Sequence, residues 1–157
     1  SSGKETDFYF DGRLVSLDPE GSVLIAQLML EGLGKKGIRG VGGLTSGADP
    51  ITSSMGVLAY QQGIPMHLFY VRKQAKGHGM KRQIEGPALK KGSKVILVDD
   101  VATTGKALIE AKEALDKLKV KIDRAIVIVD RGEGARENLA RQGLILEAIF
   151  SIKDLGF

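Results

Sequence analysis

Short apolar runs alternate along this chain with longer segments whose apolar residues recur every three or four positions. The short runs predict strands, and the longer segments predict helices. The expected strands span residues 8–13, 38–41, 65–71, 95–98, 124–130 and 144–152. The expected helices span about 18–30, 50–63 and 106–118, with a further helix centred on Leu139. This alternation predicts an α/β fold with a mainly parallel sheet that helices cover on both faces.

The first long helix carries clear signals at both ends. Asp18, Pro19 and Glu20 supply an N-cap, a proline in the first turn and an early acidic residue. Gly32 and Gly34 end the same helix. In a parallel sheet, ligands bind beyond the carboxyl ends of the strands. The loops that follow the strands are therefore the expected place of a functional site.

The most informative of these loops follows the fourth expected strand. Asp99 and Asp100 end the apolar run, and Thr103, Thr104 and Gly105 lead into a helix. Unpaired N–H groups at a helix start favour an anion, and glycine lets the backbone approach it closely. The two carboxylates repel phosphate, but they suit sugar hydroxyls and Mg²⁺. The pattern predicts a site for a phosphorylated sugar; the alternative is that the two acids merely end a strand and cap a helix.

Composition and charge narrow the choice of function. The 157 residues are 43% hydrophobic, which is enough for a single α/β domain over residues 1–157. The lack of cysteine excludes disulfides and thiolate chemistry and is compatible with the cytoplasm, where we expect the protein. A net charge of +4 fits small anionic substrates, and 5% aromatic content gives little reason to expect a nucleic-acid partner. No apolar stretch approaches the length of a membrane span and no leader opens the chain, so we expect no membrane association.

A loop at residues 72–82 is dense in cations and glycines. Its alternative interpretation is a solvated basic loop without a function. A mobile cationic flap is also what the departure of pyrophosphate requires, because negative charge builds on the leaving group. Lys73 and His78 are the main candidates, since lysine offers a compact charge and histidine can donate a proton. His67 lies within an expected strand and is interpreted as structural.

Two other loops follow strands and are expected at the same edge. The glycine-rich turn 42–50 could hold pyrophosphate in a nest of N–H groups, or it is a plain turn between a strand and a helix. Arg131 follows the strand 124–130, and its planar guanidinium could contact a carboxylate or the edge of a base.

With these segments in place, the chain resembles the orotate phosphoribosyltransferases, which are type I phosphoribosyltransferases. The resemblance extends from Ser1 to Gly156. The stretch 95–108 is similar to the family's phosphoribosyl-pyrophosphate motif. The stretch Arg72-Lys73-Gln74-Ala75-Lys76-Gly77-His78-Gly79 is similar to its flap pattern, Arg-Lys-x-x-Lys-x-His-Gly, which the purine-specific members do not share.

The resemblance implies a fold, a reaction and an assembly. The fold is the type I phosphoribosyltransferase fold, with a small hood from the amino-terminal and carboxyl-terminal segments. The reaction transfers the 5-phosphoribosyl group of phosphoribosyl pyrophosphate (PRPP) to orotate, and gives orotidine 5′-monophosphate and pyrophosphate. Mg²⁺ would be the cofactor, held mainly through substrate and water. The assembly would be a homodimer whose subunits exchange the flap.

The resemblance also assigns roles to individual residues. Lys73, His78, Asp99 and Asp100 would be catalytic, with the two acids on the ribose hydroxyls. Residues 103–107 would surround the 5′-phosphate. The substrate-binding residues that it implies are Tyr9, Phe10, Thr45, Ser46, Arg72, Lys73, Lys76, His78, Asp99, Asp100, Val101, Ala102, Thr103, Thr104, Gly105, Lys106, Ala107 and Arg131.

The residue at position 103 bears on the choice of base. Purine-specific members tend to carry an aspartate where Thr103 stands, whereas a threonine together with Arg131 suits an acidic pyrimidine with a carboxylate.

Other positions depart from the family pattern. Some members have Tyr-Lys where this chain has Thr45 and Ser46, and orotate enzymes often have threonine where Lys106 stands. The chain starts at Ser1, where members often have lysine, and without a methionine, so we expect a native segment before it.

Other interpretations stay open at this point. The acceptor could be uracil or a purine, or the chain could be a non-catalytic sensor of PRPP. A fused decarboxylase domain in a longer protein is a further alternative.

Overall fold

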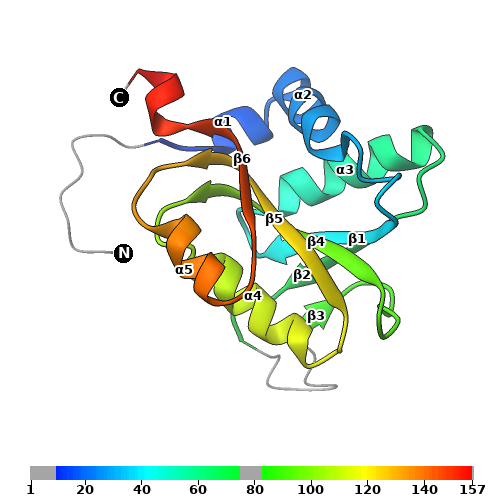
Figure 1. Ribbon diagram of the computed structural model, residues 1–157. Coiled ribbons are helices and arrows are strands. Elements are labelled where there is room, and N and C mark those ends of the chain that lie inside the picture. The colour runs from blue at the N-terminus through cyan, green and yellow to red at the C-terminus, as the bar shows by residue number, and fades with distance from the viewer. Residues whose placement is uncertain (1–9, 75–82, 157) are drawn as a thin grey trace.

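The computed structural model describes residues 10–74 and 83–156, and the described strands form one six-stranded sheet (Figure 1). The strands are β1 (Ile38–Leu44), β2 (His67–Val71), β3 (Ile84–Glu85), β4 (Lys94–Ala102), β5 (Lys121–Asp130) and β6 (Leu146–Ser151). Their order across the sheet is β3-β2-β1-β4-β5-β6. Every neighbouring pair is parallel except β2 and β3. The predicted α/β fold with a mainly parallel sheet is confirmed.

Helices cover both faces of this sheet (Figure 1). The helices are α1 (Arg13–Ser16), α2 (Pro19–Leu30), α3 (Asp49–Gln61), α4 (Lys106–Asp116), α5 (Ala135–Arg141) and the 3₁₀ helix η1 (Ile152–Leu155). α2 and α3 pack on one face, and α4 and α5 pack on the other. None of the helices in the described ranges is long and apolar enough to cross a membrane.

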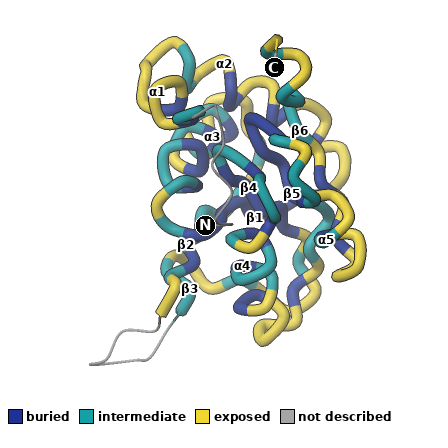
Figure 2. Tube along the Cα trace, turned by 90° about the vertical axis from the view of Figure 1, so that its left-hand side faces the viewer, coloured by how far each residue is buried: buried dark blue, intermediate teal, exposed yellow. Residues whose placement is uncertain are grey.

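The alternation of side chains along β4 explains the two layers of core. Val95 and Leu97 join the core under α4 and α5, whereas Ile96 and Val98 join the core under α2 and α3. Successive residues of a strand point to opposite faces, so an unbroken apolar run is what a strand buried on both faces needs. Figure 2 shows the buried residues concentrated along the central strands.

The amino-terminal strand prediction was wrong over its described part. Residues 10 and 11 belong to no helix or strand, and α1 begins at Arg13. The Oδ1 atom of Asp11 accepts the backbone N–H of Arg13 at 3.0 Å, which favours a turn over an extended chain. Residues 8 and 9 lie outside the described residues.

Other elements have bounds that differ from the predicted ones because of strand packing and strand pairing. β1 continues through Gly42 and Gly43, so the predicted glycine-rich turn begins at Thr45. A Cβ on Gly42 would lie 2.0 Å from the carbonyl oxygen of Phe69, so the glycine permits close strand packing. β3 begins two residues after the predicted loop 72–82 and was not predicted. The final strand ends at Ser151, one residue before the expected end, and η1 follows it.

The two ends of the described chain meet at one edge of the sheet. The segment from Phe10 lies beside the carboxyl end of β4, because it shares a cavity with Asp99 and Asp100. η1 follows the carboxyl end of β6, and its Leu155 packs against the same core as Phe10. Phe10 and Leu155 also line one groove, so the two described ends lie on the same side of the molecule.

Candidate active site

Residues at or just beyond the carboxyl ends of β1, β2, β4 and β5 meet in a cavity of about 390 Å³. It is lined by Phe10, Asp11, Arg13, Leu44, Thr45, Ser46, Gly47, Lys73, Asp99, Asp100, Val101, Thr103, Ala107 and Arg131. A second cavity of about 410 Å³ adjoins it over the β4–α4 loop, since Lys73, Asp99 and Thr103 line both. A larger apolar groove of about 920 Å³ runs between α2 and β6, but no member of the carboxylate pair lines it. The candidate site is therefore the pair of adjoining cavities.

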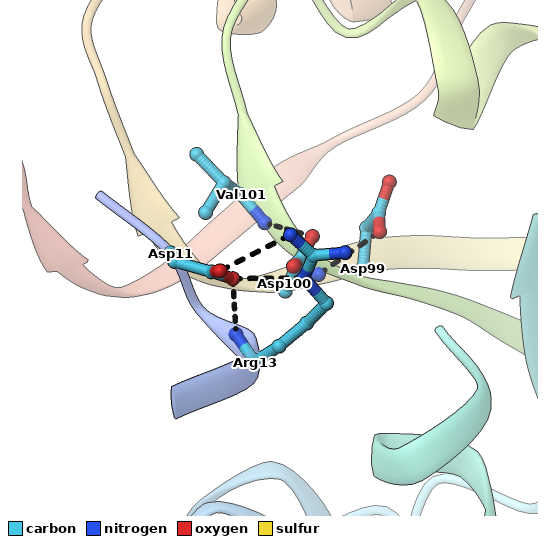
Figure 3. A network of polar contacts seen from close by, with 5 residues as sticks. All are labelled: Asp11, Arg13, Asp99, Asp100 and Val101. Carbon is cyan, nitrogen blue, oxygen red and sulfur yellow. Dashed lines mark hydrogen bonds and ion pairs between the residues drawn. The ribbon is translucent and has the colours of Figure 1, made fainter. Parts of the chain in front are cut away.

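Two acidic residues at the end of β4 form the centre of the site (Figure 3). Asp99 is buried, and its Oδ1 accepts the backbone N–H of Asp100 at 3.0 Å. The Oδ1 of Asp100 accepts the N–H of Val101 at 2.8 Å. Burial and, next, the charge of Asp100 raise the pKa of Asp99 to about 8. Both effects favour the protonated form of Asp99 when no cation is bound.

The turn after β1 lies against these carboxylates. A Cβ on Gly47 would be 2.5 Å from Oδ1 of Asp99 and 2.8 Å from Oδ1 of Asp100, so this position has room only for glycine. The N–H of Thr45 donates to the carbonyl of Val71 at 2.9 Å, which fixes the turn to the end of β2. The turn predicted for pyrophosphate and the acids of β4 thus line one cavity.

The β4–α4 loop has the geometry of an anion site. Gly105 is the N-cap of α4 and has a φ of 79°, in the left-handed region that favours glycine. The N–H groups of the first turn of α4 and the positive end of its dipole lie at the second cavity. Asn138 of α5 donates from Nδ2 to the carbonyl of Thr104 at 2.9 Å, which anchors the loop. Lys106 also lines this cavity, and its Nζ lies 3.9 Å from Glu110 Oε1.

Arg131, which directly follows β5, supplies a cation to the first cavity. The N–H of Arg131 donates to the carbonyl of Ala102 at 3.0 Å, and its Nη2 lies 3.0 Å from Glu133 Oε1. Its neighbour Asp130 is buried and pairs with Nε of Arg136 at 2.7 Å. These contacts fix the Arg131 loop to both β4 and α5.

The described residues contain no group of three or more acids or histidines arranged to hold a metal ion on their own. Asp99 and Asp100 can provide oxygen ligands of the kind that Mg²⁺ prefers, with the remaining ligands coming from phosphate and water.

Comparison with known proteins places this geometry in a family. The family described as "Phosphoribosyl transferase domain" matches residues 42–152. The orotate phosphoribosyltransferase of Synechocystis sp. is 42% identical over 155 residues, which cover 99% of this chain and 78% of that protein. The chain belongs to the orotate phosphoribosyltransferase family.

Solved structures of orotate phosphoribosyltransferases agree with this assignment. A crystal structure of the Mycobacterium tuberculosis orotate phosphoribosyltransferase matches at 38% identity and a TM-score of 0.84, and the match covers 100% of this chain and 87% of that one. Another structure of that protein, in complex with PRPP, matches at 32% identity and a TM-score of 0.79, over 95% of this chain and 84% of that one.

Residues 72–74 of the predicted flap lie within the described part of this orotate phosphoribosyltransferase family member. Lys73 lines both cavities. Arg72 lines neither of them, and its Nε pairs with Oε1 of Glu85 at 2.9 Å across β2 and β3. Three of the implied substrate-binding residues lie outside the described residues, namely Tyr9, Lys76 and His78.

Sequence reasoning missed three residues at this site. Asp11 and Arg13 line the first cavity, and Asn138 holds the β4–α4 loop. The expected strand 8–13 gave no reason to place an acidic and a basic residue beside β4. Phe10 lines the first cavity. The resemblance implied a place for Phe10 beside the base.

Proposed function

We propose that this chain is an orotate phosphoribosyltransferase of pyrimidine synthesis. It transfers the 5-phosphoribosyl group of PRPP to orotate and releases pyrophosphate and orotidine 5′-monophosphate. The observation that carries the proposal is the meeting of the Asp99–Asp100 pair, the glycine-capped start of α4 and Arg131 around two adjoining cavities. The identity of the relatives and the PRPP bound to one of them support it.

The donor sugar binds along β4 and the loop that follows it. N–H groups of residues 101–107 and the hydroxyls of Thr103 and Thr104 hold the 5-phosphate. Asp99 and Asp100 accept hydrogen bonds from the ribose hydroxyls. Thr45 and Ser46 hold the diphosphate through hydroxyls and the N–H groups of their turn.

Mg²⁺ is the cofactor in this proposal, and the carboxylate pair fits it. Burial beside a second acid raises the pKa of Asp99, because it destabilises the charged carboxylate. A nearby cation stabilises that carboxylate. Asp99 and Asp100 would hold the ion together with substrate oxygens and water. When bound, the ion supplies positive charge that stabilises the departing diphosphate.

The base site favours an acidic pyrimidine. Arg131 offers a planar guanidinium to the carboxylate of orotate. Thr103 lines the same cavity, and its hydroxyl can hydrogen-bond the base without adding a negative charge near that carboxylate. Phe10 and Tyr9 lie beside the base in this proposal.

Catalysis rests on alignment and charge. The ring nitrogen of orotate releases its proton to water and forms its bond to C1 as the C1–O bond to the diphosphate breaks, through a transition state with oxocarbenium character. Lys73 stabilises the charge that builds on the leaving diphosphate. Arg72, Lys76 and His78 assist from the flap, with His78 as the donor of a hydrogen bond or proton. No covalent enzyme intermediate is required.

We also propose a homodimer in which each flap covers the partner's site. β2 and β3 hold the base of the flap, and β3 is an edge strand of the sheet. An edge position lets a loop extend toward a second subunit. The proposed location is the cytoplasm, and residues 1–157 form one domain.

A panel of bases tests the acceptor. The protein is incubated with PRPP, Mg²⁺ and one of orotate, uracil, hypoxanthine or adenine, and base consumption is followed by ultraviolet absorbance. Consumption of orotate alone is the expected result. Turnover of another base would contradict the roles of Thr103 and Arg131, and binding of PRPP without turnover of any base would favour a sensor.

A further inference from the structure

The segment that carries Asp11 and Arg13 lies directly against the carboxylate pair. A Cβ on Gly12 would be 2.8 Å from Cβ of Asp100 and 3.3 Å from its Oδ2. On its other side, Oδ1 of Asp100 would lie 2.8 Å from a Cβ on Gly47. Asp100 is thus held between the amino-terminal segment and the turn after β1, which is the turn proposed for the diphosphate.

Asp11 holds the guanidinium of Arg13 in a two-pronged ion pair. Nε of Arg13 lies 2.8 Å from Oδ1, and Nη2 lies 3.1 Å from Oδ2 (Figure 3). The backbone N–H of Arg13 donates to the same Oδ1 at 3.0 Å. The side-chain hydrogen bond from Arg13 is the main cause of the lowered pKa of Asp11. Two of these contacts hold the guanidinium and the third fixes the backbone of Arg13, so less conformational entropy is lost when the guanidinium binds an anion.

The charges in the cavity favour a cation on this side, in addition to the proposed Mg²⁺. The carboxylate pair and a diphosphate are both anionic and repel each other. The turn 45–47 offers hydroxyls and N–H groups but no charge. The cations among the described lining residues of this cavity are Arg13, Lys73 and Arg131. Lys73 comes from the end of β2 and Arg131 from the end of β5, so Arg13 is the cation carried by the segment that touches Asp100.

We propose that Arg13 binds the diphosphate of PRPP and that Asp11 is its positioning residue. Figure 3 shows Asp11, Arg13, Asp99, Asp100 and Val101 as one network of polar contacts. In this arrangement the guanidinium lies between the carboxylate pair and the incoming diphosphate, and it offsets their repulsion. Arginine suits this role because its planar fork can bond a carboxylate and a phosphate at the same time. The inference rests on the proposed function for the identity of the sugar donor.

Replacing the guanidinium tests the inference directly. Arg13→Gln keeps a polar side chain of similar reach and removes the charge. We expect its KM for PRPP to rise about tenfold, because a charged contact to phosphate is lost. Its KM for orotate and its melting temperature stay near the wild-type values. Arg39→Gln, at the opposite end of β1, is the matched control and changes neither constant. A KM for PRPP within twofold of wild type, or a rise in the KM for orotate instead, overturns the inference.

A double-mutant cycle tests the role of Asp11. Asp11→Asn weakens the ion pair with Arg13 but leaves the guanidinium in place. It therefore raises the KM for PRPP less than Arg13→Gln does. If Asp11 acts through Arg13, adding Asp11→Asn to Arg13→Gln has little further effect. An equal effect in both backgrounds contradicts a positioning role. Arg13→Lys keeps the charge without the fork and gives an intermediate KM, which also tests the inference if Arg13→Gln does not fold.

Calorimetric titration with PRPP and Mg²⁺, without a base, separates this inference from the proposed function. Wild-type protein that binds PRPP but transfers it to no base contradicts the function, while the weaker binding of Arg13→Gln still supports the role of Arg13. Transfer to orotate with equal PRPP affinity in both proteins contradicts the role of Arg13 alone. Absence of PRPP binding by the wild type overturns both.

Discussion

Asp99 combines burial with an adjacent like charge, and both effects favour its protonated form. Its pKa rises from the ordinary value of 3.8 to about 8 in the folded protein, so folding strengthens the binding of this proton. The associated stabilisation is complete at a pH below the unfolded value and is lost as the pH rises toward 8. In the absence of ligands, Asp99 therefore makes the folded state less stable in mild alkali than in mild acid.

Asp99→Asn removes this pH dependence because an amide does not ionise. We expect the variant to melt a few degrees above wild type at about pH 9, since ~1 kcal/mol moves the midpoint of a domain of this size by about 2–4 °C. At about pH 4 most of the gain disappears, because Asp99 is then protonated in the folded wild type and about half protonated in the unfolded chain. Thermal melts of both proteins across this range make the comparison, with Glu113→Gln, an exposed position on α4, as the control. A constant difference at every pH would contradict the raised pKa.

Lys73 lines both cavities and is exposed, so it contributes to the site more than to the fold. Lys73→Ala is expected to lower kcat about a hundredfold, because a cation at the leaving group is lost. Its melting temperature stays within about 1 °C of wild type, as is usual for an exposed side chain. Lys91→Ala, in the turn before β4, is the control and keeps full turnover. Normal turnover by Lys73→Ala would refute the assignment.

At the scale of elements, the sequence predicted best what depends on neighbours in the chain. The start of α2 follows its cap, because Oδ2 of Asp18 accepts the N–H of Gly21 at 2.8 Å. The β4–α4 loop was predictable for the same reason, since the acids, hydroxyls and Gly105 are consecutive. The two-residue strand β3 was not, because only pairing with β2 defines it. The Asp11–Arg13 pair at the site was missed because its place depends on contact with β4, about 90 residues further along the chain.

The hydrogen bond from Asn138 of α5 to the β4–α4 loop also joins residues that are distant in the chain, so the sequence did not predict it. Asn138→Ala removes the hydrogen bond to the Thr104 carbonyl, which should cost about 1 kcal/mol and lower the melting temperature by about 2–4 °C. Because the loop holds the 5-phosphate, we expect the KM for PRPP to rise several-fold. Glu137→Gln, an exposed neighbour on α5, is the control for steady-state kinetics and melting. An unchanged KM for PRPP would show that the loop keeps its geometry without this anchor.

At the scale of the whole molecule, the site exists because four parallel strands end at one edge and bring distant loops together. The sequence predicted the edge and the residues after each strand, because the handedness and direction of parallel connections leave few choices. Flap exchange between subunits is implied only by the resemblance, because a flap over its own site and a flap over a partner's site have the same local pattern.

Mixing two variants of low activity tests flap exchange. His78→Ala lacks a flap donor and Asp99→Asn lacks a ribose ligand, so each homodimer has little activity in orotate consumption. If flaps are exchanged, a hybrid dimer combines one intact flap with one intact carboxylate pair. Random mixing of equal amounts then restores about a quarter of wild-type activity, since half of the dimers are hybrids and each has one complete site. Activity no higher than that of the two variants alone would show that each flap serves its own subunit.

The balance of products formed from PRPP, orotate and Mg²⁺ shows whether this chain transfers phosphoribosyl to orotate. Nucleotide is identified by mass spectrometry and pyrophosphate is measured separately. We expect equal amounts of orotidine 5′-monophosphate and pyrophosphate from the wild type, and neither product from an Asp99→Asn, Asp100→Asn double variant. Pyrophosphate without nucleotide, or equal nucleotide formation by the double variant, would contradict phosphoribosyl transfer at the carboxylate pair.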